Sequence, residues 1–224
     1  MRGDVADIFD EVDEELRADR AQALLKKYGG LIVALALLIV GAVAGWQAWR
    51  WWQTKQSLAV ATEYLNATRI ADAAGPNKDA RAKEAIAALE KVASSAPEGY
   101  RTLARLRAAA LEADNGNPKA AAGLWDQVAA DGAADPLLRD LASLVWVNHS
   151  LDTGDPALVE ARLKPLASPD NPWHGLAREA QALLYMRQGK NDQARDTLRS
   201  LAQDVTAPEG IRTRANILLT RLGA

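Results

Sequence analysis

Hydrophobic and charged positions divide the chain into three parts of different character. Residues 28–49 contain no charged side chain and have an aliphatic centre. A helix of about 20 apolar residues is long enough to cross the apolar core of a lipid bilayer, which is roughly 30 Å thick. The pattern therefore predicts a transmembrane helix over residues 28–52, a preceding arm of residues 1–27, and a following domain of residues 53–224.

Aromatic residues flank the predicted span, with one tyrosine at its beginning and four tryptophans clustered at its end. Amphipathic rings concentrate at the headgroup level of membranes. Trp46, Trp49 and Trp52 are also spaced three residues apart, so an additional hypothesis is that this side of the helix meets a partner's span. We expect five residues to anchor the chain in the membrane: Tyr28, Trp46, Trp49, Trp51 and Trp52.

Basic residues near the span predict its orientation. Cytoplasmic loops carry an excess of Lys and Arg. Four such residues precede the span and two follow it, namely Arg17, Arg20, Lys26 and Lys27 against Arg50 and Lys55. We therefore expect a single-pass protein of the bacterial inner membrane, with a cytoplasmic N-terminus and a periplasmic C-terminal domain. The lack of cysteine agrees with an oxidising compartment.

A cleaved secretion signal is the alternative interpretation of the apolar segment. Residues 31–40 have the length of a signal's apolar region, and Ala42-Val43-Ala44 resembles a cleavage site. The preceding stretch argues against cleavage, because it is about 30 residues long and acidic rather than short and basic. Cleavage would leave a soluble periplasmic repeat adaptor, for example one for envelope assembly or cell division.

The arm of residues 1–27 has the apolar spacing of an amphipathic helix. Val5, Ile8, Phe9 and Val12 follow one another at intervals of three, one and three residues. The opposite face is acidic, which argues against contact with an anionic lipid surface. The arm is either a solvated lead-in to the span or a cytoplasmic docking helix. Phe9, the only phenylalanine of the chain, is its candidate contact with a partner.

Residues 53–224 show a regular alternation of proline and glycine. Each glycine follows its proline by 17 to 19 residues, and consecutive prolines lie 36 to 39 residues apart. A period of this length, with proline before one helix and glycine between two helices, indicates helix-hairpin repeats. The punctuating residues are Pro97, Pro136, Pro172 and Pro208, with Gly116, Gly154 and Gly189 between them.

Alignment on these glycines reveals an apolar stripe in the second helix of each hairpin. A related stripe occurs in residues 85–92, and residues 208–222 form a lone last helix. Trp125 and Trp146 occupy apolar repeat positions and are expected in the core. The prediction is an all-α fold, in which the span is followed by an α-solenoid of about four degenerate tetratricopeptide-like hairpins and a C-terminal capping helix. The aligned stripes are Ala121-Trp125-Val128, Val159-Leu163-Leu166 and Ala194-Leu198-Leu201.

The order of these parts resembles a known family. The arm turns from acidic to basic and ends in Lys-Lys-Tyr-Gly at residues 26–29, and the span ends in Gly-Trp at residues 45–46. This order resembles the membrane-anchored, tetratricopeptide-like ancillary subunits of the bacterial Sec translocon, and residues 8–16 look most similar to alphaproteobacterial versions. The resemblance implies a scaffold that associates with the translocon and a membrane-bound periplasmic chaperone while exported chains are handled.

No residue pattern indicates catalysis. The chain has no cysteine, and it contains no phosphate-binding loop, nucleophile elbow or zinc-protease motif. His149 occupies a repeat position that is otherwise held by leucine, so we expect a semi-buried structural histidine rather than a ligand. A net charge of −2 offers no electrostatic basis for nucleic acid binding. The sequence therefore predicts a non-enzymatic protein without a metal or cofactor.

Polar positions of the repeats supply candidate contacts for partner proteins. Arg105 and Arg178 occupy one aligned column, and Tyr185 occupies a column seven residues later on the same helix face. This face is either simply solvated or the wall of a concave groove for a peptide or partner helix. Trp173 follows a loop, and we expect it to be exposed, as tryptophans at interfaces often are.

Overall fold

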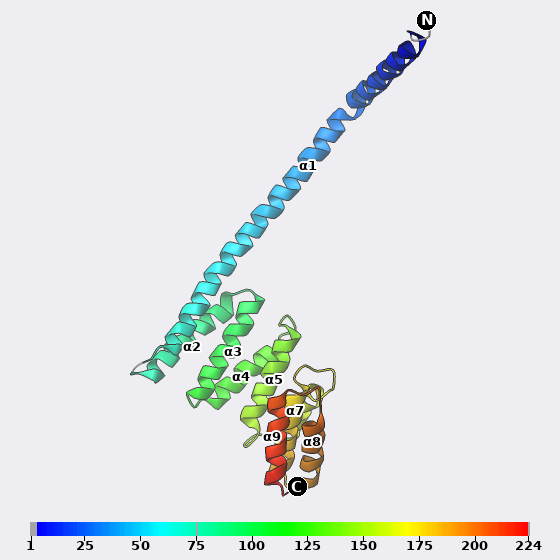
Figure 1. The fold of residues 1–224 in the computed structure, drawn as a ribbon. Helices are drawn as coiled ribbons and strands as arrows, with labels where there is room; N and C mark the ends of the chain where they lie inside the picture. The colour runs from blue at the N-terminus through cyan, green and yellow to red at the C-terminus, as the bar shows by residue number, and fades with distance from the viewer. Residues whose placement is uncertain (1–3, 75, 224) are drawn as a thin grey trace. The chain divides into compact units, whose positions relative to one another are not determined.

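The computed structural model describes the backbone of residues 4–74 and 76–223, and the side chains of these residues except 4–25, 27, 32, 53, 54 and 56. By their contacts, the residues fall into two compact units, Met1–Ser57 and Leu58–Ala224. Throughout the described residues the regular structure is helical, as expected (Figure 1). The helices are α1 (Asp4–Asp72), α2 (Lys78–Ser95), α3 (Glu98–Asp114), α4 (Pro118–Ala130), α5 (Pro136–Ser150), α6 (Pro156–Leu166), α7 (His174–Arg187), α8 (Asn191–Gln203) and α9 (Glu209–Arg221).

In the first unit, α1 carries the apolar segment. It is the one helix of the described residues that is long and apolar enough to cross a membrane, with a mean hydropathy of 2.3 over its most apolar stretch. None of that stretch is buried in the structure, which distinguishes it from the core helix of a soluble domain. The aliphatic side chains of residues 33–43 are exposed, so no described side chain covers their apolar surface.

The second unit is a row of helix hairpins. Helix α3 packs against α4, α5 against α6, and α7 against α8, and each hairpin also packs against the helix that follows it (Figure 1). The last part of α1 shares a core with α2 and α3 through Ala67. Helix α9 follows the hairpin of α7 and α8 as a single last helix and packs on both of them. The expected all-helical solenoid of hairpins is therefore confirmed.

The predicted stripe residues form the core of this solenoid. Small residues let neighbouring helices approach, and the large residue that follows fills the space between them. Burying one such leucine or valine side chain contributes roughly 1.5–3 kcal/mol. All of the following stripe residues are at most 2% exposed: Ala85, Leu89, Val92, Ala121, Trp125, Val128, Val159, Leu163, Leu166, Ala194, Leu198 and Leu201.

Glycine ends the first helix of two hairpins in a left-handed backbone conformation. Gly116 and Gly189 have φ of 78° and 71°, which side chains disfavour. The N–H of Gly116 donates to the carbonyl of Ala113, and the next N–H donates to the carbonyl of Glu112, so the last carbonyls of α3 are satisfied. Gly189 closes α7 in the same way.

The other two hairpins turn differently. A Cβ atom at Gly154 would lie 2.7 Å from the carbonyl oxygen of Ser150, so this position requires glycine because of close approach. Before α2, Asn77 adopts the positive φ of 67°, which asparagine tolerates better than most residues. Gly75, the glycine expected in that turn, lies outside the described residues.

Candidate functional site

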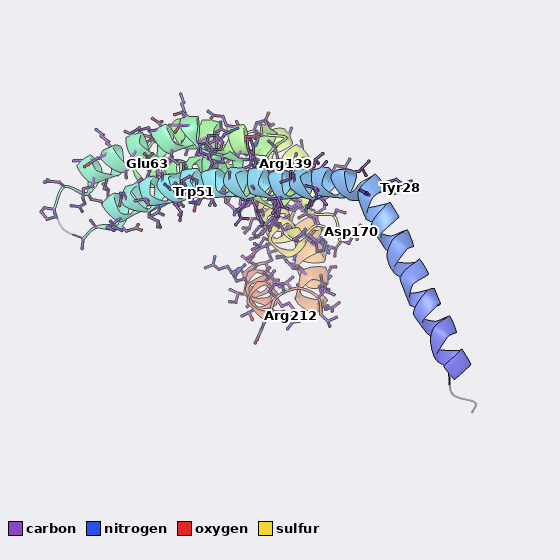
Figure 2. The ribbon with its side chains drawn as sticks, turned by 90° about the horizontal axis from the view of Figure 1, so that it is seen from above. Tyr28, Trp51, Glu63, Arg139, Asp170 and Arg212 are labelled. Carbon is purple, nitrogen blue, oxygen red and sulfur yellow. The ribbon has the colours of Figure 1, made fainter. Side chains whose placement is uncertain are left out.

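The four tryptophans at the end of the apolar segment lie on the surface of α1. Their residues are 50–61% exposed, and Tyr28, at the other end of the segment, is also exposed. Figure 2 labels Trp51 and Tyr28 on α1. The rings of Trp49 and Trp52 pack at a centroid distance of 5.7 Å. The side chains of the anchor residues expected from the sequence can therefore contact surrounding lipid or solvent.

Two cations lie over rings of this cluster. The guanidinium of Arg50 lies 4.6 Å from the ring centroid of Trp46, and the ammonium of Lys55 lies 4.0 Å from that of Trp51. Such cation–π contacts contribute about 0.5–1 kcal/mol at exposed sites. Arg50 and Lys55 were not expected among the anchor residues, although each follows its tryptophan by four residues, which is the spacing of neighbours on a helix face.

The two candidate arginines of the repeats each bind within their own hairpin. Arg105 Nη1 lies 3.0 Å from Asp131 Oδ2, at the end of α4. Arg178 Nη1 donates to Ser200 Oγ on α8 over 3.2 Å. Both side chains are half-buried. In these two hairpins the arginine thus joins the first helix to the second, and this role accounts for part of the polar character of the position.

Arg105 also lines a shallow hollow of the surface. The hollow has a volume of about 230 Å³ and lies between α2, α3 and α4. Its wall combines apolar with polar side chains, from Glu90, Ala93, Ser94, Arg105, Leu124 and Gln127. Such a mixed wall suits a peptide or helix contact better than a small molecule, which favours deeper, mostly apolar pockets.

Tyr185 has polar neighbours on α7 and just after it. Its hydroxyl accepts a hydrogen bond from Gln181 Nε2 at 3.2 Å. The ammonium of Lys190 lies 5.9 Å from its ring centroid, and the residue is half-buried. The half-exposed ring keeps part of its surface available for a partner.

Trp173 is half-buried, whereas Trp125 and Trp146 are buried, so it is the most exposed tryptophan of the repeats, as expected, although its ring is not fully exposed. Its ring packs against the core of the middle hairpins, and its Nε1 donates to the carbonyl of Leu137 over 3.1 Å. Asn171 fixes the same loop, because it accepts from the Trp173 N–H at 2.8 Å and donates to Asp140 at 2.8 Å. The indole therefore joins two neighbouring repeats.

His149 is exposed, not semi-buried as its repeat position indicated. Its ring stacks on that of Trp125 at a centroid distance of 4.7 Å. Trp125 and Trp146 are buried in the core, as expected. Trp125 occupies the place that leucine holds in the other two aligned stripes, so the exposed histidine has an aromatic ring to stack on.

Polar contacts cross from one repeat to the next at separations of 35 or 36 residues. Arg107 pairs with Asp72, and Arg162 pairs with Asp126 at 2.6 Å. Arg187 donates to the carbonyl of Leu151 at 2.7 Å. None of these pairs could be found from the apolar period, because that period identifies buried faces and not the polar atoms that meet at their edges.

The strongest of these contacts holds the capping helix. Arg214 of α9 donates from Nε and Nη2 to the two carboxylate oxygens of Glu179 on α7, each over 2.6 Å. The hydrogen bonds to Glu179 raise the pKa of Arg214 above its ordinary value, against the effect of burial. Because both charges are paired in a fork geometry, Glu179 is accommodated in a buried position.

The turn between α8 and α9 contains a carboxylate whose charged form is favoured. Asp204 accepts hydrogen bonds from the Thr206 hydroxyl at 2.6 Å and from the Thr206 backbone N–H at 2.8 Å. These bonds lower the pKa of Asp204 below its ordinary value of 3.8.

Replacing Thr206 with Val is expected to raise the pKa of Asp204 toward its ordinary value, because the hydroxyl donor is lost. In the wild type, the ionised carboxylate stabilises the fold above the unfolded-state pKa, and this stabilisation is lost as the pH falls through the lower folded-state pKa. An NMR titration of the Asp204 carboxyl carbon measures the change. Thr213→Val, at an exposed position of α9, is the matched control; an Asp204 pKa equal in wild type and T206V would contradict the assignment.

In the part of the chain whose side chains are described, no three His, Asp or Glu side chains lie together as a metal site would require. Phe9, the candidate contact of the arm, lies outside the described side chains. What the described residues offer is therefore a mixed polar and apolar repeat surface and an aromatic cluster with two cations.

Comparison with known proteins identifies the repeats. A family model described as a tetratricopeptide repeat-like domain matches residues 22–222, which is most of the chain. Domains of this kind typically mediate protein interactions and are not enzymes. Searches of curated proteins and of solved structures found no match.

Proposed function

Because the chain belongs to the tetratricopeptide repeat-like family, we propose that it is a non-enzymatic scaffold, tethered to a membrane by α1, whose repeats bind partner proteins. The observation that carries this proposal is the family match over residues 22–222. Stacked hairpins of this family present extended surfaces that suit protein partners.

The apolar segment of α1 supports the membrane tether. A helix rises about 1.5 Å per residue, so Tyr28 and Trp49 lie about 32 Å apart along α1. This distance corresponds to the roughly 30 Å apolar core of a bilayer. The rings at both ends would then lie at the two headgroup levels, with the exposed aliphatic side chains between them in contact with lipid.

The more specific form of the proposal names the compartment and the partners. The excess of basic residues before the span favours a cytoplasmic N-terminus, which places the repeats in the periplasm of a bacterium. The resemblance of the arm, the span and the repeats to ancillary Sec translocon subunits supports the translocon and a membrane-bound periplasmic chaperone as partners. In this arrangement, Phe9 is the candidate contact in the cytoplasm, and Arg105, Trp173, Arg178 and Tyr185 are the candidates in the periplasm.

A photo-crosslinking experiment in native membranes tests these partners. Tyr185 is replaced by a photoreactive phenylalanine analogue, which keeps an aromatic ring at this half-buried position. We expect crosslinks to translocon subunits and to a membrane-bound chaperone, identified by mass spectrometry. The same analogue at Lys119, an exposed position of α4, serves as the control.

The outcomes separate the general from the specific proposal. Defined partners other than the translocon would leave the scaffold intact and refute the translocon assignment. If the analogue at position 185 crosslinks to no protein, or to the same proteins as the analogue at position 119, this face is not the binding surface. If the chain is instead cleaved after Ala42-Val43-Ala44, the product is a soluble adaptor. An intact mass equal to that of a chain beginning at Gly45 would favour this alternative.

A further inference from the structure

The basic residues of the tryptophan cluster lean toward the apolar segment. Arg50 lies over Trp46 and Lys55 lies over Trp51, so both cations contact a ring four residues earlier in α1. Side chains of an α-helix are tilted toward its N-terminus, which favours this direction. If α1 spans a bilayer, both charges are thereby drawn back toward the apolar segment, to the level of the lipid headgroups, and not held in the water beyond.

The rings surround the helix instead of forming one face. Each residue turns the helix by about 100°. Measured from Trp46, Arg50 lies at about 40°, Trp51 at about 140°, Trp52 at about 240° and Trp49 at about 300°. All four tryptophans are exposed. A single partner helix would cover only one side, whereas a lipid headgroup layer contacts the whole circumference.

The local charge of this region is positive. The sequence contains no Asp or Glu from Tyr28 to Thr62, and its two charged residues are Arg50 and Lys55. A guanidinium or ammonium in cation–π contact with tryptophan keeps its positive charge. That charge attracts the phosphate of an anionic lipid.

We propose that this collar, made of Trp46, Trp49, Arg50, Trp51, Trp52 and Lys55, binds the phosphates of anionic glycerophospholipids and so gives the anchor a preference for anionic over zwitterionic lipid. The proposal rests on the membrane tether proposed above and adds the lipid class that the tether selects. The tryptophan rings lie among the glycerol and upper acyl groups, and the two cations approach the headgroup phosphates on opposite sides of the helix.

Quenching of tryptophan fluorescence by brominated lipids measures this preference. The full-length protein is reconstituted in vesicles that contain phosphatidylglycerol and phosphatidylcholine in equal amounts, with bromine on the acyl chains of only one of them. Bromine quenches tryptophans that contact the lipid, and Trp125, Trp146 and Trp173 of the repeats add a constant background. We expect a relative binding constant of about fivefold or more in favour of phosphatidylglycerol.

Paired variants identify the cause of the preference. Arg50→Gln with Lys55→Gln should reduce the ratio to about one, and Arg50→Lys with Lys55→Arg should retain it, since charge is preserved. Lys91→Gln with Lys119→Gln removes the same charge from exposed repeat positions and should leave the ratio unchanged. One molar salt should weaken the preference, because it screens exposed charges.

Two kinds of failure are distinguishable. Equal quenching by the two brominated lipids in the wild type, or a preference that survives in R50Q/K55Q, would overturn the lipid proposal while leaving the tether in place. Absence of quenching by either lipid would show that the tryptophans do not contact acyl chains, and it would refute the membrane tether together with the collar.

Discussion

Replacing Trp125 with Ala is expected to lower the free energy of unfolding of the repeat domain by about 3–5 kcal/mol, which is the range for removal of a large aromatic side chain from a core. Trp125 is only 2% exposed and lies in the stripe of α4 that faces the core. Its removal leaves a cavity between the α3–α4 hairpin and the α5–α6 hairpin, and it also removes the surface on which His149 stacks. Urea unfolding of the detergent-solubilised full-length protein, followed by circular dichroism, measures the loss.

Variants at two neighbouring positions show whether the loss arises from the core. Gln127→Ala changes an exposed residue of the same helix and should alter the free energy of unfolding by no more than about 0.5 kcal/mol. His149→Ala removes only the stacked, exposed ring, so its effect should be much smaller than that of Trp125→Ala. A change below about 1 kcal/mol for Trp125→Ala would mean that α4 does not pack as the structure shows.

The repeated stripes show why the fold could be predicted from the sequence. In a helix, buried positions recur every three or four residues, and a solenoid repeats the same packing problem in each hairpin. Ala121, Leu163 and Leu201 were therefore recognisable as core residues before any tertiary contact was known, and all are buried.

The polar part of the surface could not be predicted in the same way. The alignment assumes that equivalent positions have equivalent surroundings, and His149 shows where this fails, because its neighbour in α4 is Trp125 and not leucine. Trp173 also has a contact that the alignment could not predict. Its indole N–H donates to the carbonyl of Leu137, 36 residues away. Every residue has a backbone carbonyl, so a pattern of side-chain types cannot predict such a contact.

The candidate partner contacts remain predictions after the structure. Arg105 and Arg178 have intramolecular partners, Asp131 and Ser200, so part of their role is to join the helices of a hairpin. A side chain in this position can also bind a partner protein. Breaking its intramolecular contact costs free energy, however, and so reduces the net free energy of binding. Tyr185, whose ring remains half-exposed, is for that reason the most informative of the candidates to label.

Replacing Leu38 and Ile39 with Asp is expected to abolish stable membrane association of the chain. The two positions lie at the centre of the apolar segment, and each aspartate at the centre of a span costs about 2.5–3.5 kcal/mol on insertion scales. Each remaining Leu, Ile or Val of the segment returns only about 0.3–0.6 kcal/mol on the same scales, so two aspartates exceed the apolar gain. Extraction of membranes with alkaline carbonate, followed by immunoblotting of pellet and supernatant, measures the change.

Leu58→Asp with Leu65→Asp provides the matched control. These leucines are as exposed as those of the apolar segment, at 63% and 55%, and they lie on the same helix, but in the second unit. The wild type and this control should both stay in the carbonate-resistant pellet. Release of the wild type as a chain that begins at Gly45 would identify the segment as a cleaved signal, because a signal and an anchor share the same apolar requirement and differ in whether the segment remains in the mature protein.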